Sequence, residues 1–104
     1  MDRSRRFRIF HEALAAAARG PFFPDWEFHT LFGLERSEVE QIAFNFAEST
    51  EIDGAVRLAI NGAMNNLLGY PHGCDNQWHD WLSVTRHELS EIYELWLSDP
   101  RSEP

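Results

Sequence analysis

The chain contains no lysine, a single cysteine and no long apolar run. Cys74 cannot form an internal disulfide, and an unpaired thiol is typical of a reducing compartment. We therefore expect a cytoplasmic protein. No apolar stretch approaches the roughly 20 residues that a bilayer-spanning helix needs, so we expect no membrane-spanning protein. The missing lysine has a simple explanation in a GC-rich genome that favours arginine, and it indicates no function.

Strand patterns are also missing from the sequence. No segment alternates apolar and polar residues as a half-buried strand does, whereas apolar residues recur at helical spacing along the chain. The predicted fold class is therefore all-α. With 104 residues, the chain forms one domain, 1–104, that can bury about two-thirds of the surface its unfolded form exposes. A core without a metal or a disulfide is feasible at this size.

Acidic residues outnumber basic ones, and the balance changes along the chain. Residues 1–20 hold five arginines and two acids, whereas residues 21–104 hold four arginines and fifteen acids. A surface with the formal net charge of −8 repels phosphate backbones and anionic lipid. We therefore expect no nucleic-acid partner and no membrane partner, and a basic protein as the partner.

The sequence repeats itself at an offset of fifty residues. Without any gap, seven identities relate residues 6–48 to residues 56–98, against about three expected by chance. Apolar positions also pair with apolar positions, as two copies of one buried pattern should. The identities are Ala13/Ala63, Pro21/Pro71, Asp25/Asp75, His29/His79, Arg36/Arg86, Glu38/Glu88 and Ile42/Ile92.

The repeat predicts four main helices and two short helical turns. Asp25 and Asp75 are placed to cap the short turns. Two capping boxes, Ser37-x-x-Glu40 and Thr85-x-x-Glu88, mark the starts of the second and fourth helices. The expected architecture is two tandem helix-loop-helix units that form a pseudo-two-fold four-helix bundle. The predicted helices span about residues 4–18, 37–48, 53–68 and 85–98.

The beginning of the sequence superficially resembles a secretory signal peptide, because four arginines precede an alanine-rich stretch. His11 and Glu12 interrupt the apolar region that such a signal needs. Phe10 and its apolar neighbours match apolar positions of the second copy. We therefore expect a folded helix here, with frayed ends at residues 1–3 and 99–104.

One loop gathers side chains that can bind zinc. His72, Cys74, Asp75, His79 and Asp80 fall within nine residues, and all are zinc-ligand types. Their spacing matches no zinc finger, and the first copy has phenylalanine and proline in place of His72 and Cys74. We therefore predict no metal and no cofactor. The alternative is a metal-binding or small-molecule-binding domain that uses His72, Cys74, Asp75 and His79.

The repeated pairs Asp25/His29 and Asp75/His79 place a carboxylate one helical turn from an imidazole. General-base catalysis uses such pairs, but it also needs a nucleophile or an electrophilic stabiliser within reach. No serine or cysteine recurs beside both histidines. We therefore predict structural hydrogen bonds within these pairs and a non-enzymatic protein.

Two other polar sets are also predicted to be structural. Arg36 and Arg86 lie at helix starts and are placed to pair with acids across the pseudo-two-fold axis. Asn61, Asn65 and Asn66 lie mainly opposite the apolar stripe of the third helix. We expect these asparagines to form a solvated face, with a polar contact surface as the alternative.

The best functional signal is the acidic surface of the second and fourth helices. Their acids lie on the solvent side, and Phe44 and Leu95 fall outside the buried stripes as apolar knobs. The prediction is a protein–protein interaction module that binds a basic partner, of the size and acidity of an inhibitor or a bacterial immunity protein. A self-associating structural protein, such as a homodimer, is a further alternative. The predicted partner-binding residues are Glu40, Phe44, Glu48, Glu91, Glu94 and Leu95.

Overall fold

The computed structural model describes residues 3–47 and 49–98. Every regular element in these two ranges is a helix, which confirms the all-α class. Arg3 is already helical, and the other predicted frayed residues, 1, 2 and 99–104, lie outside the described residues. The elements are α1 (Arg3–Arg19), α2 (Asp25–Phe32), α3 (Arg36–Asn45), α4 (Gly54–Gly69), the 3-10 turn η1 (Asp75–Gln77), α5 (Trp78–Trp81) and α6 (Arg86–Ser98).

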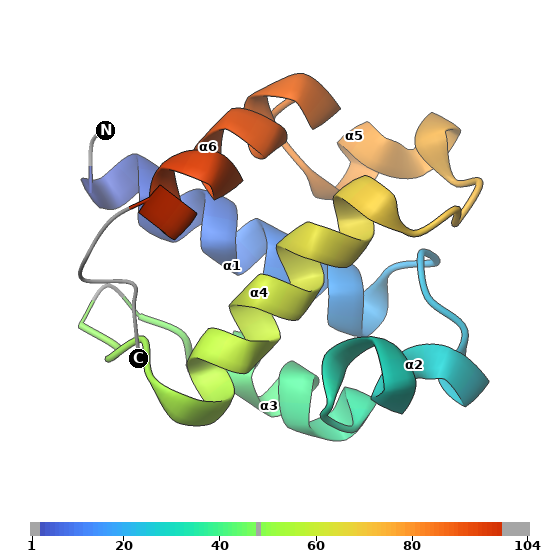
Figure 1. Cartoon of the computed structure of the whole chain (residues 1–104), viewed down its shortest axis with the longest axis horizontal. Coiled ribbons are helices and arrows are strands. Elements are labelled where there is room, and N and C mark those ends of the chain that lie inside the picture. Colours follow the sequence, from blue (N-terminus) through green and yellow to red (C-terminus); the bar gives the residue numbers. More distant parts are fainter. Residues whose placement is uncertain (1–2, 48, 99–104) are drawn as a thin grey trace.

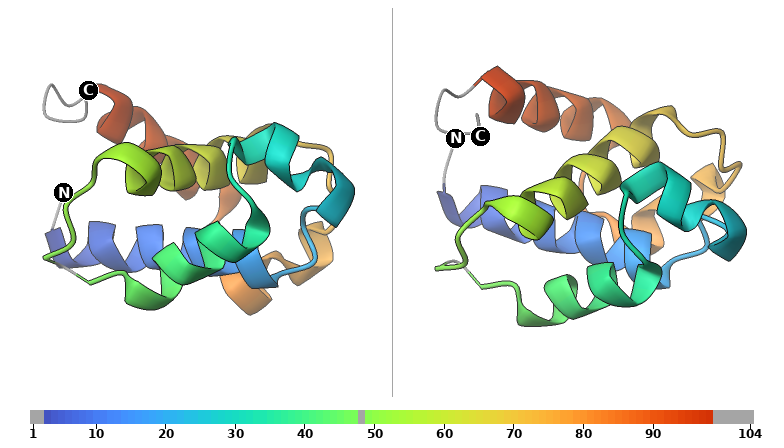
Figure 2. Two further views of the ribbon diagram at one scale, coloured as in Figure 1. Left: turned by 90° about the horizontal axis from the view of Figure 1, so that it is seen from below. Right: turned by 60° about the horizontal axis from the view of Figure 1, so that its bottom comes forward.

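Helices α1 and α4 cross in the middle of the molecule (Figure 1). α3 lies against α1 on one side of this pair, and α6 lies against α4 on the other side (Figure 2). Each short helix packs against the long helix of the other half of the sequence: α2 packs against α4, and α5 packs against α1. The outer surfaces of α3 and α6 therefore lie on opposite sides of the central pair.

The core is built from the apolar stripes of the two crossing helices. Ala13, Leu14 and Ala17 of α1 are fully buried, as are Ile60 and Met64 of α4. The stripes predicted for the first and third helices are thus confirmed, and the alanine-rich stretch belongs to a folded helix. Burying each large side chain contributes about 1.5–3 kcal/mol, so the contact between α1 and α4 is a main source of stability.

The predicted short turn after Asp25 is an eight-residue helix, α2. Its Phe28 and Phe32 stack with ring centroids 4.3 Å apart and are almost completely buried. Phe32 lies against Gly62 of α4, where an added Cβ would be 2.7 Å from the ring. Gly33 ends α2 with a φ of 72°, a conformation that favours glycine.

The capping box predicted for α3 is wrong by two residues. The helix begins at Arg36, and the backbone N–H of Glu35 donates to the Glu38 carboxylate at 3.0 Å. Ser37 therefore lies inside the first turn, where it cannot cap with Glu40 as its partner. The reason is that Glu35 and Glu38 have the same three-residue separation as the predicted pair, so the spacing alone does not fix the helix start.

The capping box of α6 is confirmed, because Thr85 and Glu88 exchange two hydrogen bonds of 3.0 Å. The inner stripes predicted for the second and fourth helices end with Ala47 and Leu97, and both stripes are too long. α3 ends at Asn45 instead of about residue 48, and Ala47 and Leu97 are exposed. The chain turns to an extended conformation at Phe46, which stacks on Phe7 of α1 at 5.2 Å.

Candidate functional site

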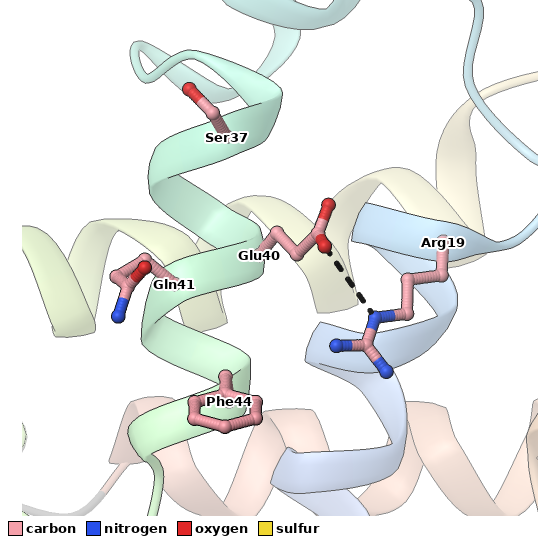
Figure 3. Close-up of a pocket in the computed structure, with 5 residues that line it drawn as sticks. All are labelled: Arg19, Ser37, Glu40, Gln41 and Phe44. Atoms are coloured by element: carbon pink, nitrogen blue, oxygen red, sulfur yellow. Dashed lines mark ion pairs between the residues drawn. The ribbon is translucent and has the colours of Figure 1, made fainter.

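The outer surface of α3 carries Glu40 and Phe44, two of the predicted partner-binding residues (Figure 3). Glu40 and Phe44 line a shallow depression with Ser37, Gln41 and, from α1, Arg19. Phe44 is 76% exposed, as the sequence predicted. The carboxylate of Glu40 lies 3.9 Å from the Nε atom of Arg19, so an arginine offsets part of the acidic charge on this surface.

The outer surface of α6 carries three further residues that were predicted to bind a partner. Glu91, Glu94 and Leu95 line a separate shallow depression with Ser98, and Leu95 is 61% exposed. Glu91 lies 3.5 Å from the Nε2 atom of His87, which carries charge only when it is protonated. Among the described residues no arginine pairs with Glu91 or Glu94, so this surface keeps more of its negative charge than the surface of α3.

The five predicted residues that the structure describes do not form one surface. α3 and α6 lie on opposite sides of α1 and α4 (Figures 1 and 2), which divides the set into Glu40 and Phe44 on one side and Glu91, Glu94 and Leu95 on the other. Glu48 lies outside the described residues. Glu40 and Phe44 therefore share no surface with Glu91, Glu94 and Leu95.

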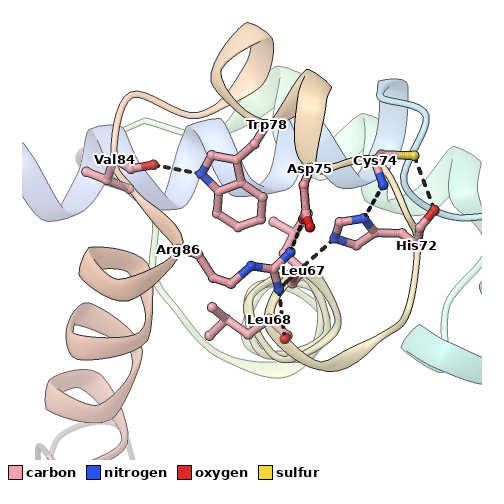
Figure 4. Close-up of polar contacts among 8 residues, drawn as sticks. All are labelled: Leu67, Leu68, His72, Cys74, Asp75, Trp78, Val84 and Arg86. Atoms are coloured by element: carbon pink, nitrogen blue, oxygen red, sulfur yellow. Dashed lines mark hydrogen bonds and ion pairs between the residues drawn. The ribbon is translucent and has the colours of Figure 1, made fainter.

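Arg86 joins α4, η1 and α5 at one end of the molecule (Figure 4). Its guanidinium donates to the carbonyl oxygens of Leu67 and Leu68 at 3.2 and 3.0 Å and pairs with the carboxylate of Asp75. The same guanidinium lies over the ring of Trp78, 5.0 Å from its centroid. The last carbonyls of α4 therefore receive donors that the helix itself does not supply.

Arg36 makes the corresponding contacts fifty residues earlier. It donates to the carbonyl oxygens of Ala17 and Ala18 at 3.2 and 3.1 Å and to the carboxylate of Asp25 at 2.7 Å. It also lies 4.5 Å from the centroid of the Phe28 ring. The two arginines thus satisfy the ends of the two long helices through equivalent neighbours.

These contacts correct three predictions about the repeated polar residues. Asp25 and Asp75 pair with arginines instead of histidines, and each is the first residue of its element instead of the cap. His79 points its Nδ1 atom at the carbonyl oxygen of Leu82, 3.0 Å away. The arginines pair within their own half of the sequence and not across the molecule. Arginine suits these carboxylates because its guanidinium carries several charged donors in a fixed fork.

The loop with potential zinc ligands is held together by its own hydrogen bonds (Figure 4). The Nδ1 atom of His72 accepts the backbone N–H of Cys74 at 3.0 Å, and its Nε2 atom lies 3.2 Å from the carbonyl oxygen of Leu67. The thiol of Cys74 lies 3.3 Å from the His72 carbonyl oxygen. In the described part of the chain, no three His, Cys, Asp or Glu side chains are grouped to hold a metal ion, and His79 points elsewhere.

The asparagine run is mostly not a solvated face. Asn66 is 8% exposed and donates to the carbonyl oxygen of Leu31 in α2 at 3.1 Å. Asn61 accepts a 2.7 Å hydrogen bond from the hydroxyl of Tyr93, whose pKa is raised by burial. Only Asn65 is exposed. The asparagines of α4 therefore fasten α2 and α6 to the central helix.

Trp26 is an exposed aromatic residue that the sequence prediction missed. It is 79% exposed, the highest value among the large apolar side chains of the described residues. In the sequence it is one of five aromatic residues between residues 20 and 35, and nothing in that segment alone separates it from the four phenylalanines. A signal was present, because its counterpart at the fifty-residue offset is Asn76, an exposed polar residue, whereas the buried Phe28 is matched by the buried Trp78.

Comparisons with protein-family models, curated proteins and solved structures found no match to this chain. None of the helices in residues 3–47 and 49–98 is both long enough and apolar enough to cross a bilayer.

Proposed function

We propose that the protein is a non-enzymatic interaction module that binds a basic partner protein, in the manner of an inhibitor or a bacterial immunity protein. The observation that carries this proposal is the outer surface of α6. There Glu91 and Glu94 flank the exposed Leu95, and no described arginine neutralises them. An apolar anchor beside two like charges is suited to a basic surface that has its own apolar recess.

The charge of the whole chain supports a basic partner. Its formal net charge of −8 attracts a cationic protein over a distance of about 8–10 Å at physiological salt and repels nucleic acid. Electrostatic attraction of this kind mainly raises the association rate and discriminates against acidic competitors. The surface of α3 is the weaker candidate, because Arg19 offsets Glu40 there.

The polar pairs support a binding role over a catalytic one. Asp25 and Asp75 are committed to arginines that hold the ends of the helices, so neither carboxylate orients a histidine as a general base would require. We place this module in the cytoplasm, on the ground that its one cysteine cannot form an internal disulfide.

We propose that the fold arose as two helix-loop-helix units with pseudo-two-fold symmetry. The contacts of Arg36 recur at Arg86 on residues fifty positions later, and α2 and α5 are exchanged between the halves. In such an arrangement α3 and α6 are counterparts. The differences between them, including Phe44 against Glu94 and Asn45 against Leu95, are then the places where the two surfaces specialised.

The test is affinity capture from the source organism, followed by mass spectrometry, with charge-reversed variants. We expect the wild-type chain to enrich a basic protein and the double variant Glu91→Lys/Glu94→Lys to lose it. The matched control is Glu51→Lys/Asp80→Lys, which makes the same charge change at exposed positions away from α3 and α6 and should retain the partner. Equal recovery by both double variants would overturn the assignment to α6.

A further inference from the structure

Trp26 projects from the outside of α2, on a rigid support. The buried Phe28 and Phe32 fasten this helix to the core, so a side chain that is 79% exposed in its first turn faces solvent. The fold does not require an indole there, since the counterpart position holds Asn76. An exposed tryptophan offers a large contact area at low conformational cost, which is why tryptophan is frequent among interface anchors.

Two carboxylates flank this indole along the chain. Asp25 remains 90% exposed although its Oδ1 atom bonds to Arg36 at 2.7 Å, so its other oxygen is open to a further donor. The Glu27 carboxylate raises the pKa of Tyr70, chiefly as a hydrogen-bond acceptor for its hydroxyl and with a further contribution from desolvation. Asp25, Glu27 and Arg36 together carry a net charge of −1, which favours a cation beside the ring.

Two contacts within the chain show which cation binds an aspartate and an aromatic ring together. Arg36 bonds to Asp25 while it lies over the ring of Phe28, and Arg86 bonds to Asp75 while it lies over the ring of Trp78. A guanidinium can do both at once because it is planar and has several donors, whereas the compact ammonium of lysine cannot stack.

We propose that Trp26, with the carboxylates of Asp25 and Glu27, receives an arginine side chain of the basic partner. The guanidinium stacks on the indole and donates to the open oxygen of Asp25. This inference rests on the proposed function, since it assumes a basic partner, but it assigns the contact to α2 and specifies arginine over lysine. It adds a residue-specific contact to the long-range attraction of the acidic surfaces.

Calorimetric titration of the full-length chain with nona-arginine and nona-lysine peptides tests the proposal. The wild-type chain should bind nona-arginine more tightly than nona-lysine. Trp26→Asn, which installs the counterpart residue, should weaken nona-arginine binding about fivefold and reduce the preference for arginine. Trp26→Phe should lie between the two. Leu97→Ala is the matched control: it also replaces an exposed apolar residue with its counterpart, and it should bind like the wild type.

The outcomes separate this inference from the proposed function. Circular dichroism first shows that each variant is folded. Unchanged nona-arginine binding by Trp26→Asn, or full binding by Trp26→Leu, overturns the inference, because leucine keeps the apolar contact and removes the aromatic ring. In that case the proposed function stands without Trp26 if the peptides bind Glu91→Lys/Glu94→Lys more weakly than they bind the wild type. A wild-type chain that binds neither peptide contradicts both proposals.

Discussion

Arg36 and Arg86 connect the end of each long helix to the element that follows it. Each donates to two carbonyl oxygens at the end of a helix, binds an aspartate and covers an aromatic ring. These contacts need the several fixed donors of a guanidinium. The absence of lysine from the chain therefore costs nothing at these two positions, since lysine would not replace arginine there.

Replacing Arg36 by lysine should lower the free energy of unfolding by about 2 kcal/mol, because hydrogen bonds to a charged group are lost while the carbonyls of Ala17 and Ala18 stay partly buried. Urea unfolding measures the change. The control Arg8→Lys lies on the exposed side of α1 and should change the value by less than about 0.5 kcal/mol. Equal stability of Arg36→Lys and the wild type would show that the contacts of the Arg36 guanidinium are dispensable.

Glu88 should make stability depend on pH in the acid range. Hydrogen bonds from the backbone and side chain of Thr85 hold its pKa below the ordinary value of 4.5, and Arg5 adds to the effect. A lowered pKa in the folded state means that the stabilisation is present above the unfolded pKa and is lost as the pH falls through the folded pKa. The wild-type chain should therefore exceed Glu88→Gln in stability at neutral pH, and the difference should shrink as the pH falls below 4.5 and vanish only below the lowered pKa of the folded state. Urea unfolding across this range tests it, and a difference that persists in acid would refute it.

At the scale of elements, the helices begin where local side chains satisfy their first N–H groups. Thr85→Ala should destabilise the protein by about 1 kcal/mol, because Thr85 bonds to the backbone of Glu88 at 3.0 Å. Ser37→Ala should be almost neutral, since Ser37 lies within α3 and not at its cap. Thermal or urea unfolding of the pair compares them directly, and a larger loss for Ser37→Ala would restore the capping box read from the sequence.

The contact between α2 and α4 depends on a missing side chain. An alanine Cβ at Gly62 would lie 2.7 Å from the ring of Phe32, so Gly62→Ala should destabilise by about 1–3 kcal/mol through overpacking. Gly69→Ala meets nothing within 4 Å and should raise stability by about 0.4–1 kcal/mol. The two midpoints in urea should therefore move in opposite directions. If Gly62→Ala proved as stable as Gly69→Ala, the close approach of the two helices would be wrong.

The sequence predicts the helices well because helical periodicity is local. The burial of Leu14, Met64 and their neighbours follows from spacing within one helix. Hydrogen-bond partners are less predictable. Asn66 bonds to Leu31, 35 positions earlier in the sequence, and Asp25 pairs with Arg36 although His29 is nearer in the sequence. Nothing in a local pattern distinguishes these partners. The division of the acidic residues between two opposite surfaces likewise depends on the packing of whole helices.

At the scale of the whole molecule, a chain with a repeated sequence pattern carries two unequal surfaces. Most buried positions are apolar in both halves, with exceptions such as Phe22 against His72 and Ala16 against Asn66, whereas the exposed Trp26, Phe44 and Leu95 are matched by polar residues. Folding explains why the buried residues are apolar, but it does not explain the exposed apolar residues. The exposed apolar residues and the acids near them are therefore where we expect the protein to bind its partner.

The association rate of the captured basic partner, measured against salt concentration by stopped-flow mixing, tests the central claim most directly. Exposed charges are screened within about 8 Å at physiological ionic strength, and surface charges act mainly on association. We predict that the rate for the wild-type chain falls steeply as salt rises, and that Glu91→Lys/Glu94→Lys lowers both the rate and its salt dependence. A rate that is independent of salt, or equal in the wild type and this variant, would contradict the account.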